Sequence, residues 1–174
     1  MSNWKYCGQF SYMTQAPMAG DGYFDEAEAK RRYNDPDAML TILPPVDEAT
    51  GIVPYFIVVT TAEVPAFTVF EQTPPGVIEG EVWFAPVADG RLFARAATIR
   101  QFPPADDILV RNNNQALKTV ITENREDGTG TLQLHERGSD MVQKADRRDV
   151  PVAALYREQP AWGEWHSLRE EPQQ

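Results

Sequence analysis

The feature of this sequence that most constrains its fold is a series of short segments rich in Val, Ile, Thr, Phe and Tyr, separated by turn residues. Such residues favour extended strands, and regular turns between them are typical of antiparallel sheets. Near the N-terminus, Trp4, Tyr6, Phe10 and Tyr12 alternate with more polar residues, which is the two-residue period of a strand. The further expected strands span residues 39–43, 53–61, 66–72, 77–85, 91–102, 117–123, 131–136 and 152–157.

Turn chemistry separates these segments. Asp89-Gly90 and Asp127-Gly128 each lie between two of them, and Asp-Gly is a strong signal for a hairpin. Proline pairs also stand between strands and break the ladder, because proline has no amide proton to donate; they occupy positions 44–45, 74–75 and 103–104. Residues 104–116 fit either a helical turn or the end of a strand, and the polar segment 138–148 is expected at the surface.

One short helix is expected near the N-terminus. Asp25 can cap a helix over residues 26–33, whose first turn is acidic and whose last turn is basic. That order suits the helix dipole, and Asn34-Asp35-Pro36 ends the segment.

These patterns predict a mainly β protein that forms a single domain over residues 1–174. We expect an antiparallel β-barrel or sandwich of about eight or nine strands with one short N-terminal helix. A length of 174 residues fits one domain, and a content of 42% hydrophobic and 24% charged residues is ordinary for a globular chain. Closure into a barrel is attractive because free edges of apolar strands promote aggregation.

Charge and targeting signals bound the compartment and the partners. The formal charge of −10 disfavours nucleic acid, whose binding draws on clustered Lys and Arg. The longest apolar run, residues 55–59, is far shorter than the ~20 residues of a membrane helix, so no membrane association is expected. The sequence begins without the apolar core of a signal peptide, and its single cysteine, Cys7, forms no internal disulfide. A cytoplasmic location follows as the expectation.

No motif for catalysis, metal binding or a cofactor stands out. The two histidines, His135 and His166, lack the spacing of a metal site, and no serine lies in a Gly-x-Ser-x-Gly elbow. Cys7 is expected to be a packed, inert thiol, and no glycine-rich run leads into a helix as in a phosphate loop. We therefore predict no cofactor and no metal, and we assign no catalytic residue.

The hairpin formed by residues 77–85 and 91–102 contains the main candidate site. If Ala85 faces Arg91, then Trp83 faces Phe93 and Glu81 faces Arg95. This register gathers five candidate residues on one face: Glu79, Glu81, Trp83, Phe93 and Arg95. The face is either an outer surface with a weak ion pair, or the lumen of a barrel in which Glu81 and Arg95 orient a ligand between aromatic walls.

The segment 160–169 contains a second candidate. If it is helical, Trp162, Trp165 and Arg169 share one face. Tryptophan and arginine are enriched where proteins bind partners, but the same residues also dock a terminal segment onto its own domain. Both alternatives stay open at this point.

Two functions fit these observations. The first is a non-catalytic acidic interaction protein that binds a basic protein partner, such as an inhibitor, an immunity-type protein or a subunit of an assembly. The second is a small-molecule-binding β-barrel, such as a biosynthetic isomerase or cyclase that uses a pocket carboxylate and aromatic walls. An enclosed cavity would favour the second, and a filled interior with a flat acidic face would favour the first.

Overall fold

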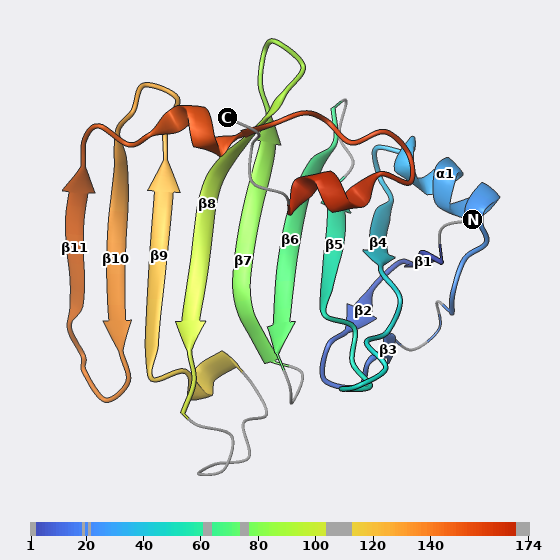
Figure 1. Ribbon diagram of the computed structural model, residues 1–174, viewed down its shortest axis with the longest axis horizontal. Coiled ribbons are helices and arrows are strands. Elements are labelled where there is room, and N and C mark those ends of the chain that lie inside the picture. Colours follow the sequence, from blue (N-terminus) through green and yellow to red (C-terminus); the bar gives the residue numbers. More distant parts are fainter. Residues whose placement is uncertain are drawn as a thin grey trace.

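A ten-stranded antiparallel sheet forms the frame of the protein (Figure 1). The structure, a computed structural model, describes residues 3–18, 20, 22–60, 64–73, 77–103 and 113–169. The strands are β1 (Lys5–Cys7), β4 (Met39–Leu43), β5 (Tyr55–Thr60), β6 (Ala66–Thr73), β7 (Val77–Pro86), β8 (Leu92–Gln101), β9 (Lys118–Asn124), β10 (Gly130–Glu136), β11 (Val142–Arg147) and β12 (Tyr156–Arg157). A separate pair joins β2 (Phe10–Ser11) to β3 (Ala16–Pro17).

The sheet is open, so the prediction of a closed barrel is wrong. Strands β4 to β11 follow one another as a meander, β1 pairs with β4, and β12 pairs with β8. Strands β1 and β11 therefore lie at opposite edges of the sheet (Figure 1). No second large sheet stacks on the first within the described residues, so a sandwich is not formed either. The mainly β, antiparallel character is confirmed.

The N-terminal helix lies where the sequence predicts it. Helix α1 spans Glu26–Tyr33, and the Asp25 carboxylate caps it by accepting a hydrogen bond of 2.8 Å from the amide of Glu28. Hydrogen bonds from Arg31 and Arg32 lower the pKa of the Glu28 carboxyl to about 2. The helix packs on the sheet through the fully buried Ala29.

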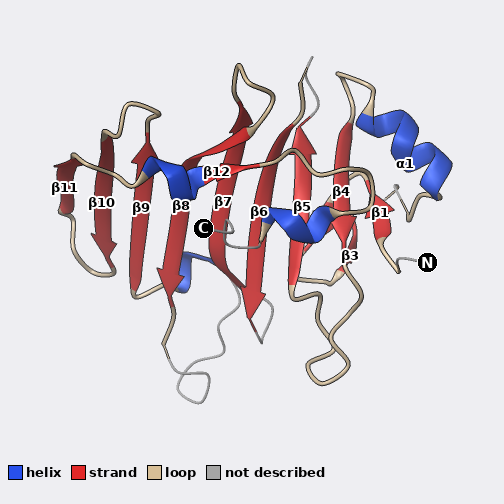
Figure 2. Ribbon diagram, turned by 45° about the horizontal axis from the view of Figure 1, so that its top comes forward, coloured by secondary structure: helices blue, strands red, loops and turns tan. Residues whose placement is uncertain are grey.

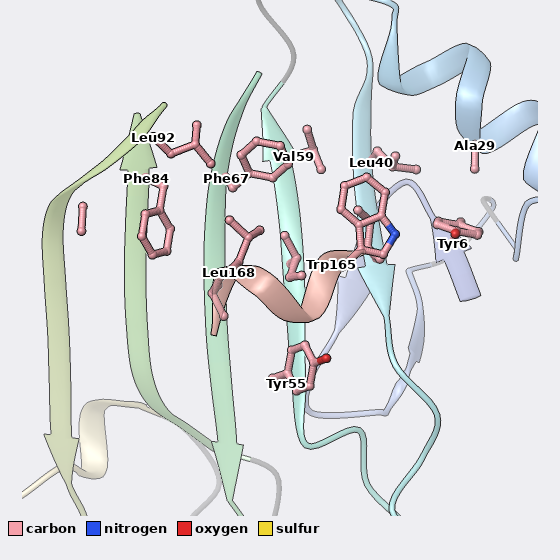
Figure 3. Close-up of a cluster of buried hydrophobic side chains, with 14 residues drawn as sticks. Tyr6, Ala29, Leu40, Tyr55, Val59, Phe67, Phe84, Leu92, Trp165 and Leu168 are labelled. Atoms are coloured by element: carbon pink, nitrogen blue, oxygen red, sulfur yellow. The ribbon is translucent and has the colours of Figure 1, made fainter. Parts of the chain in front are cut away.

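A chain segment that follows β11 crosses one face of the sheet, and we call residues 150–169 the strap (Figures 1 and 2). The strap contains the short helices η2 (Val152–Leu155) and η3 (Trp165–Leu168), with β12 between them. Trp165 and Leu168 are buried in one cluster with Ala29, so the strap and α1 cover the same face of the sheet (Figure 3). We call this the strap face.

A second apolar cluster lies on the opposite face, which we call the far face. Phe56 of β5 stacks on Phe70 of β6 there, with 4.7 Å between ring centroids, and Phe10 of β2 packs on Phe56 at 5.4 Å. Cys7 is buried in the same cluster, as predicted for a packed thiol. The sheet is thus covered on both faces near β4 and β5.

Two of the strand predictions differ from the structure: β11 is not predicted, and the expected strand at 152–157 is only partly formed. Strand β11 falls in the segment 138–148 that was expected to be irregular surface, because its residues are exposed on nearly every position and show no apolar alternation. The expected strand 152–157 is instead the helix η2 followed by the two-residue β12. Some expected features lie outside the described residues, namely residue 61, the proline pair 74–75, Pro104 and most of the segment 104–116.

Candidate functional site

The register of the β7–β8 hairpin differs from the predicted one. Ala85 faces Phe93 rather than Arg91, and the ladder shifts by one further residue between Trp83 and Phe84. Below this bulge Glu81 faces Thr98, so the predicted pair of Glu81 with Arg95 is not formed. An extra residue in one strand turns later side chains to the opposite face, which alternation alone does not reveal.

The shift gives each charged candidate a different partner. Glu81 forms an ion pair with Arg100, with 3.1 Å between Oε2 and Nη2. Arg95 instead pairs with Glu126 of the β9–β10 turn, with 2.6 Å between Nη2 and Oε1. The two ion pairs belong to separate parts of the sheet, and the predicted clamp of Glu81 and Arg95 is absent.

The other hairpin candidates also separate. Trp83 is 45% exposed and faces Ala96, whereas Phe93 is fully buried against Tyr156 at 5.0 Å between ring centroids. Glu79 is exposed beside the irregularity that interrupts the β6–β7 ladder. The five residues Glu79, Glu81, Trp83, Phe93 and Arg95 therefore do not gather in one site.

The tryptophans of the C-terminal segment hold the strap on its own domain. Trp165 is fully buried in the main core, within a short 3-10 helix rather than the longer helix considered from the sequence (Figure 3). Trp162 stacks on Tyr6 at 5.4 Å and donates a hydrogen bond of 3.3 Å from Nε1 to Glu26. Both side chains thus contact the domain itself, which is the self-packing alternative.

Polar contacts fasten the end of the strap. The Tyr55 hydroxyl lies 2.9 Å from Nδ1 of His166, and Arg169 lies 4.0 Å above the Tyr55 ring. The Arg169 guanidinium also donates two hydrogen bonds, of 2.6 and 2.8 Å, to the Glu71 carboxylate. Burial raises the pKa of the Tyr55 hydroxyl against the opposing effect of the Arg169 charge. The strap is therefore tied to β5 and β6.

A cavity of about 360 Å³ remains between the strap and the sheet, and we call it the strap pocket. Its volume falls in the range of small-molecule sites. Its floor is apolar and consists of strap-face residues of β6, β7 and β8, namely Val69, Val82, Phe84, Ala94 and Ala97. Its roof consists of strap residues, including Leu155 and Leu168.

Within the described part of the chain, three arginines and one glutamate line this apolar pocket. Arg147 comes from β11, Arg157 from β12 and Arg169 from the end of the strap, and Glu71 is held by Arg169. Arg147 makes one long hydrogen bond of 3.4 Å to Oδ1 of Asn124, and none of the described carboxylates lies within 4.0 Å of its guanidinium. Among the described residues that line the pocket, arginines outnumber carboxylates, although the chain carries a formal charge of −10.

The sequence contains no local signal for this pocket. Arg147 lies in the segment expected to be polar surface, and Arg157 ends a segment expected to be a strand. The sequence pattern places Arg169 on one helical face with Trp162 and Trp165. The three side chains meet only because the chain folds back across the sheet after β11.

The described residues contain no cluster of three or more potential metal ligands among His, Cys, Asp and Glu. Of the helices that the structure describes, none combines the length and the apolar content needed to cross a bilayer. Comparison with protein-family models, with curated proteins and with solved structures found no match. Inference about function therefore rests on the geometry of this chain.

Proposed function

We propose that this chain binds a small organic anion with an apolar body in the strap pocket. The observation that supports the proposal is that three arginine side chains, from three separate segments, line one apolar cavity of about 360 Å³. Guanidinium forms paired hydrogen bonds with carboxylate and phosphate, and the apolar floor suits a hydrocarbon or aromatic group. The ligand class is a carboxylate or phosphate monoester that carries such a group.

Local charge outweighs the net charge of the chain at this site. At physiological ionic strength, charges are screened beyond about 8 Å, so a bound anion interacts mainly with the arginines that line the pocket. Partly buried cations in an apolar pocket are costly unless they are paired, and within the described residues Arg147 donates one long side-chain hydrogen bond, to a neutral amide. A ligand carboxylate beside Arg147 supplies the missing counter-charge.

The pocket favours the small-molecule hypothesis over the protein-partner hypothesis. The ligand site differs from the one expected from the sequence, since it lies under the strap and not in the lumen of a barrel. Among the described residues of the pocket wall there is one carboxylate, Glu71, which accepts two hydrogen bonds from Arg169. We therefore propose binding and assign no catalytic step. A basic protein partner stays a prediction.

Calorimetric titration with octanoate and phenylbutyrate tests the proposal, with octanamide and acetate as controls. We expect both amphipathic acids to bind, octanamide to bind more weakly because it lacks charge, and acetate to bind more weakly because it lacks an apolar body. Failure of both amphipathic acids to bind, or equal binding of octanamide, contradicts the proposal.

Two variants locate the binding site. Arg147→Gln removes one charge-assisted hydrogen bond worth about 1.5–3 kcal/mol, so we expect octanoate affinity to fall about tenfold or more. Ala97→Leu fills the apolar floor and is expected to block binding, since Ala97 lines the pocket. Arg125→Gln is the matched control, because Arg125 lies in the exposed β9–β10 turn and does not line the pocket.

A further inference from the structure

A second pocket lies at the end of the sheet where β8 ends and β9 begins. It has a volume of about 460 Å³ and is lined by residues of β8, β9, β10 and the short helix η1 (Asn113–Gln115). Thr119 and Ile121 of β9 face this pocket, whereas Thr122 and Asn124 face the strap pocket. Because side chains alternate along a strand, the second pocket opens on the far face. We call it the far pocket.

Three buried polar atoms of residues that line the far pocket have no hydrogen-bond partner. They are Nη1 of Arg100, Oδ1 of Asn113 and Nε2 of His135. A buried polar atom without a partner costs free energy, and such atoms are rare in folded proteins. The structure describes six unpartnered buried side-chain atoms, and three of them belong to this one pocket.

The neighbours of Arg100 leave part of its guanidinium for a ligand. The Arg100 side chain is 15% exposed, and its Nη2 is already bound to Oε2 of Glu81 at 3.1 Å. This ion pair orients the guanidinium, and Nη1 of the same group has no hydrogen-bond partner. A ligand oxygen can accept that hydrogen bond, and a charged oxygen does so most strongly.

His135 and Asn113 define what else the ligand must carry. The imidazole Nε2 of His135 donates or accepts according to its tautomer, so it adapts to a carboxylate or a hydroxyl. The Oδ1 atom of Asn113 only accepts, so it requires a donor group on the ligand. Further polar groups of the lining, from Thr119, Ser139 and Arg137, can bond additional hydroxyls.

We propose that the far pocket binds a small hydroxylated anion of the sugar-acid type. The acid group accepts from Arg100, and a hydroxyl donates to Asn113 while His135 bonds a neighbouring oxygen. The proposal is independent of the function proposed for the strap pocket, because the two pockets share no lining residue. Its ligand is polar throughout, whereas the strap-pocket ligand has an apolar body.

The two histidines allow a test within a single sample. His135 lines the far pocket, whereas His166 lies in the strap against Tyr55. Titration with gluconate, followed by magnetic resonance of the two imidazole rings, is expected to shift the His135 signal and leave the His166 signal in place. Glucose lacks the negative charge, and hexanoate is charged but lacks the hydroxyls. Both are therefore expected to leave the His135 signal in place.

Variants then identify the contacts. Asn113→Ala and Arg100→Gln are each expected to weaken gluconate binding at least about tenfold, because each leaves a ligand group without its partner. Asn113→Ala removes an amide with no hydrogen-bond partner for its Oδ1, so this variant is expected to stay folded and to supply the decisive comparison. Arg125→Gln, whose side chain lies outside the far pocket, is the charge-matched control.

The outcomes separate the two proposals. No shift of the His135 signal up to about 1 mM gluconate, or equal binding by wild type and Asn113→Ala, overturns the far-pocket proposal. A gluconate-dependent shift of the His166 signal alone also overturns it, because the ligand then binds elsewhere. None of these results bears on octanoate binding in the strap pocket, which has its own variants.

Discussion

The two halves of the sheet are built from the same kind of strand but differ in what covers them. Strands β4 to β8 contain the fully buried apolar side chains, including Leu40, Ile57, Phe67 and Leu92. In strands β9 to β11, which the structure describes throughout, the buried residues are Asn124, Gly130 and Thr131. On the strap face, the change from buried to exposed apolar side chains begins at Ile99 of β8, which is 61% exposed.

In this fold, a strand can form without contributing to the core. Leu132, Leu134 and Val120 continue the apolar strap face into the second half, but they are only partly buried. The ladder extends there through backbone hydrogen bonds, whereas α1 and the strap helix η3 pack on the first half. The stability of the domain is therefore expected to be concentrated in β4 to β8.

The largest expected effect is at the strap. Trp165→Ala removes a fully buried side chain that contacts Tyr33, Phe67 and Trp162. We expect a loss of about 3–5 kcal/mol in the free energy of unfolding, measured with urea. Val142→Ala, on the exposed edge strand β11, is the control and is expected to cost less than about 0.5 kcal/mol. Similar losses in both variants would contradict the comparison.

A matched pair of leucines compares the halves directly. Leu40 of β4 is fully buried, and Leu134 of β10 is partly exposed on the same face of the sheet. Leu40→Ala is expected to cost about 2–5 kcal/mol because it leaves a cavity. Leu134→Ala is expected to cost about 1 kcal/mol because water fills the space. Thermal and urea unfolding measure both, and a larger loss at Leu134 would show that the second half is covered in solution.

Gly130 is expected to be an exception to this difference between the two halves. A Cβ atom added at Gly130 would collide with the backbone carbonyl oxygen of Glu123 on the neighbouring strand. Gly130→Ala is therefore expected to cost about 1–3 kcal/mol although it lies in the less covered half. Gly80→Ala is a useful control, since a Cβ there meets only the Glu71 side chain, at 3.3 Å. Unchanged urea unfolding of Gly130→Ala would show that the β9–β10 ladder is loosely paired.

The smallest expected effect concerns alkaline pH. Burial raises the pKa of Tyr6 and of Tyr55, which both belong to the covered half. A raised pKa in the folded state means that stability is complete below the unfolded value near 10 and falls as pH rises through the folded value. We expect Tyr55→Phe to be less stable at neutral pH but to lose less stability between about pH 10 and 11. An unchanged slope above pH 10 would assign the alkaline loss to other groups.

The sequence predicts the bounds of individual strands and of the helix better than it predicts how the sheet closes or is covered. Strand β4 and helix α1 match their predicted bounds, because β-rich composition, capping and charge order are local signals. Openness of the sheet is a long-range property, since it depends on whether the edge strands β1 and β11 pair with each other. The exposed strand β11 has no apolar alternation and so leaves no signal.

The site was beyond prediction for related reasons. Glu81 pairs with Arg100 rather than Arg95 because a bulge shifts the β7–β8 register, and alternation does not reveal a bulge. The strap pocket joins Arg147, Arg157 and Arg169, which come from separate segments. Trp165 was recognised as important, although its role is to fill the core.

The strap has a consequence for synthesis of the chain. Translation proceeds from the N-terminus, so β4 to β8 can pair as they emerge, each with the strand made just before it. Their strap face stays uncovered until Trp165 and Leu168 have been added. During that interval the nascent protein exposes a broad hydrophobic surface, and chaperones bind such surfaces. Mutations that weaken the strap should therefore lower the cellular yield of the protein more than its stability in the test tube suggests.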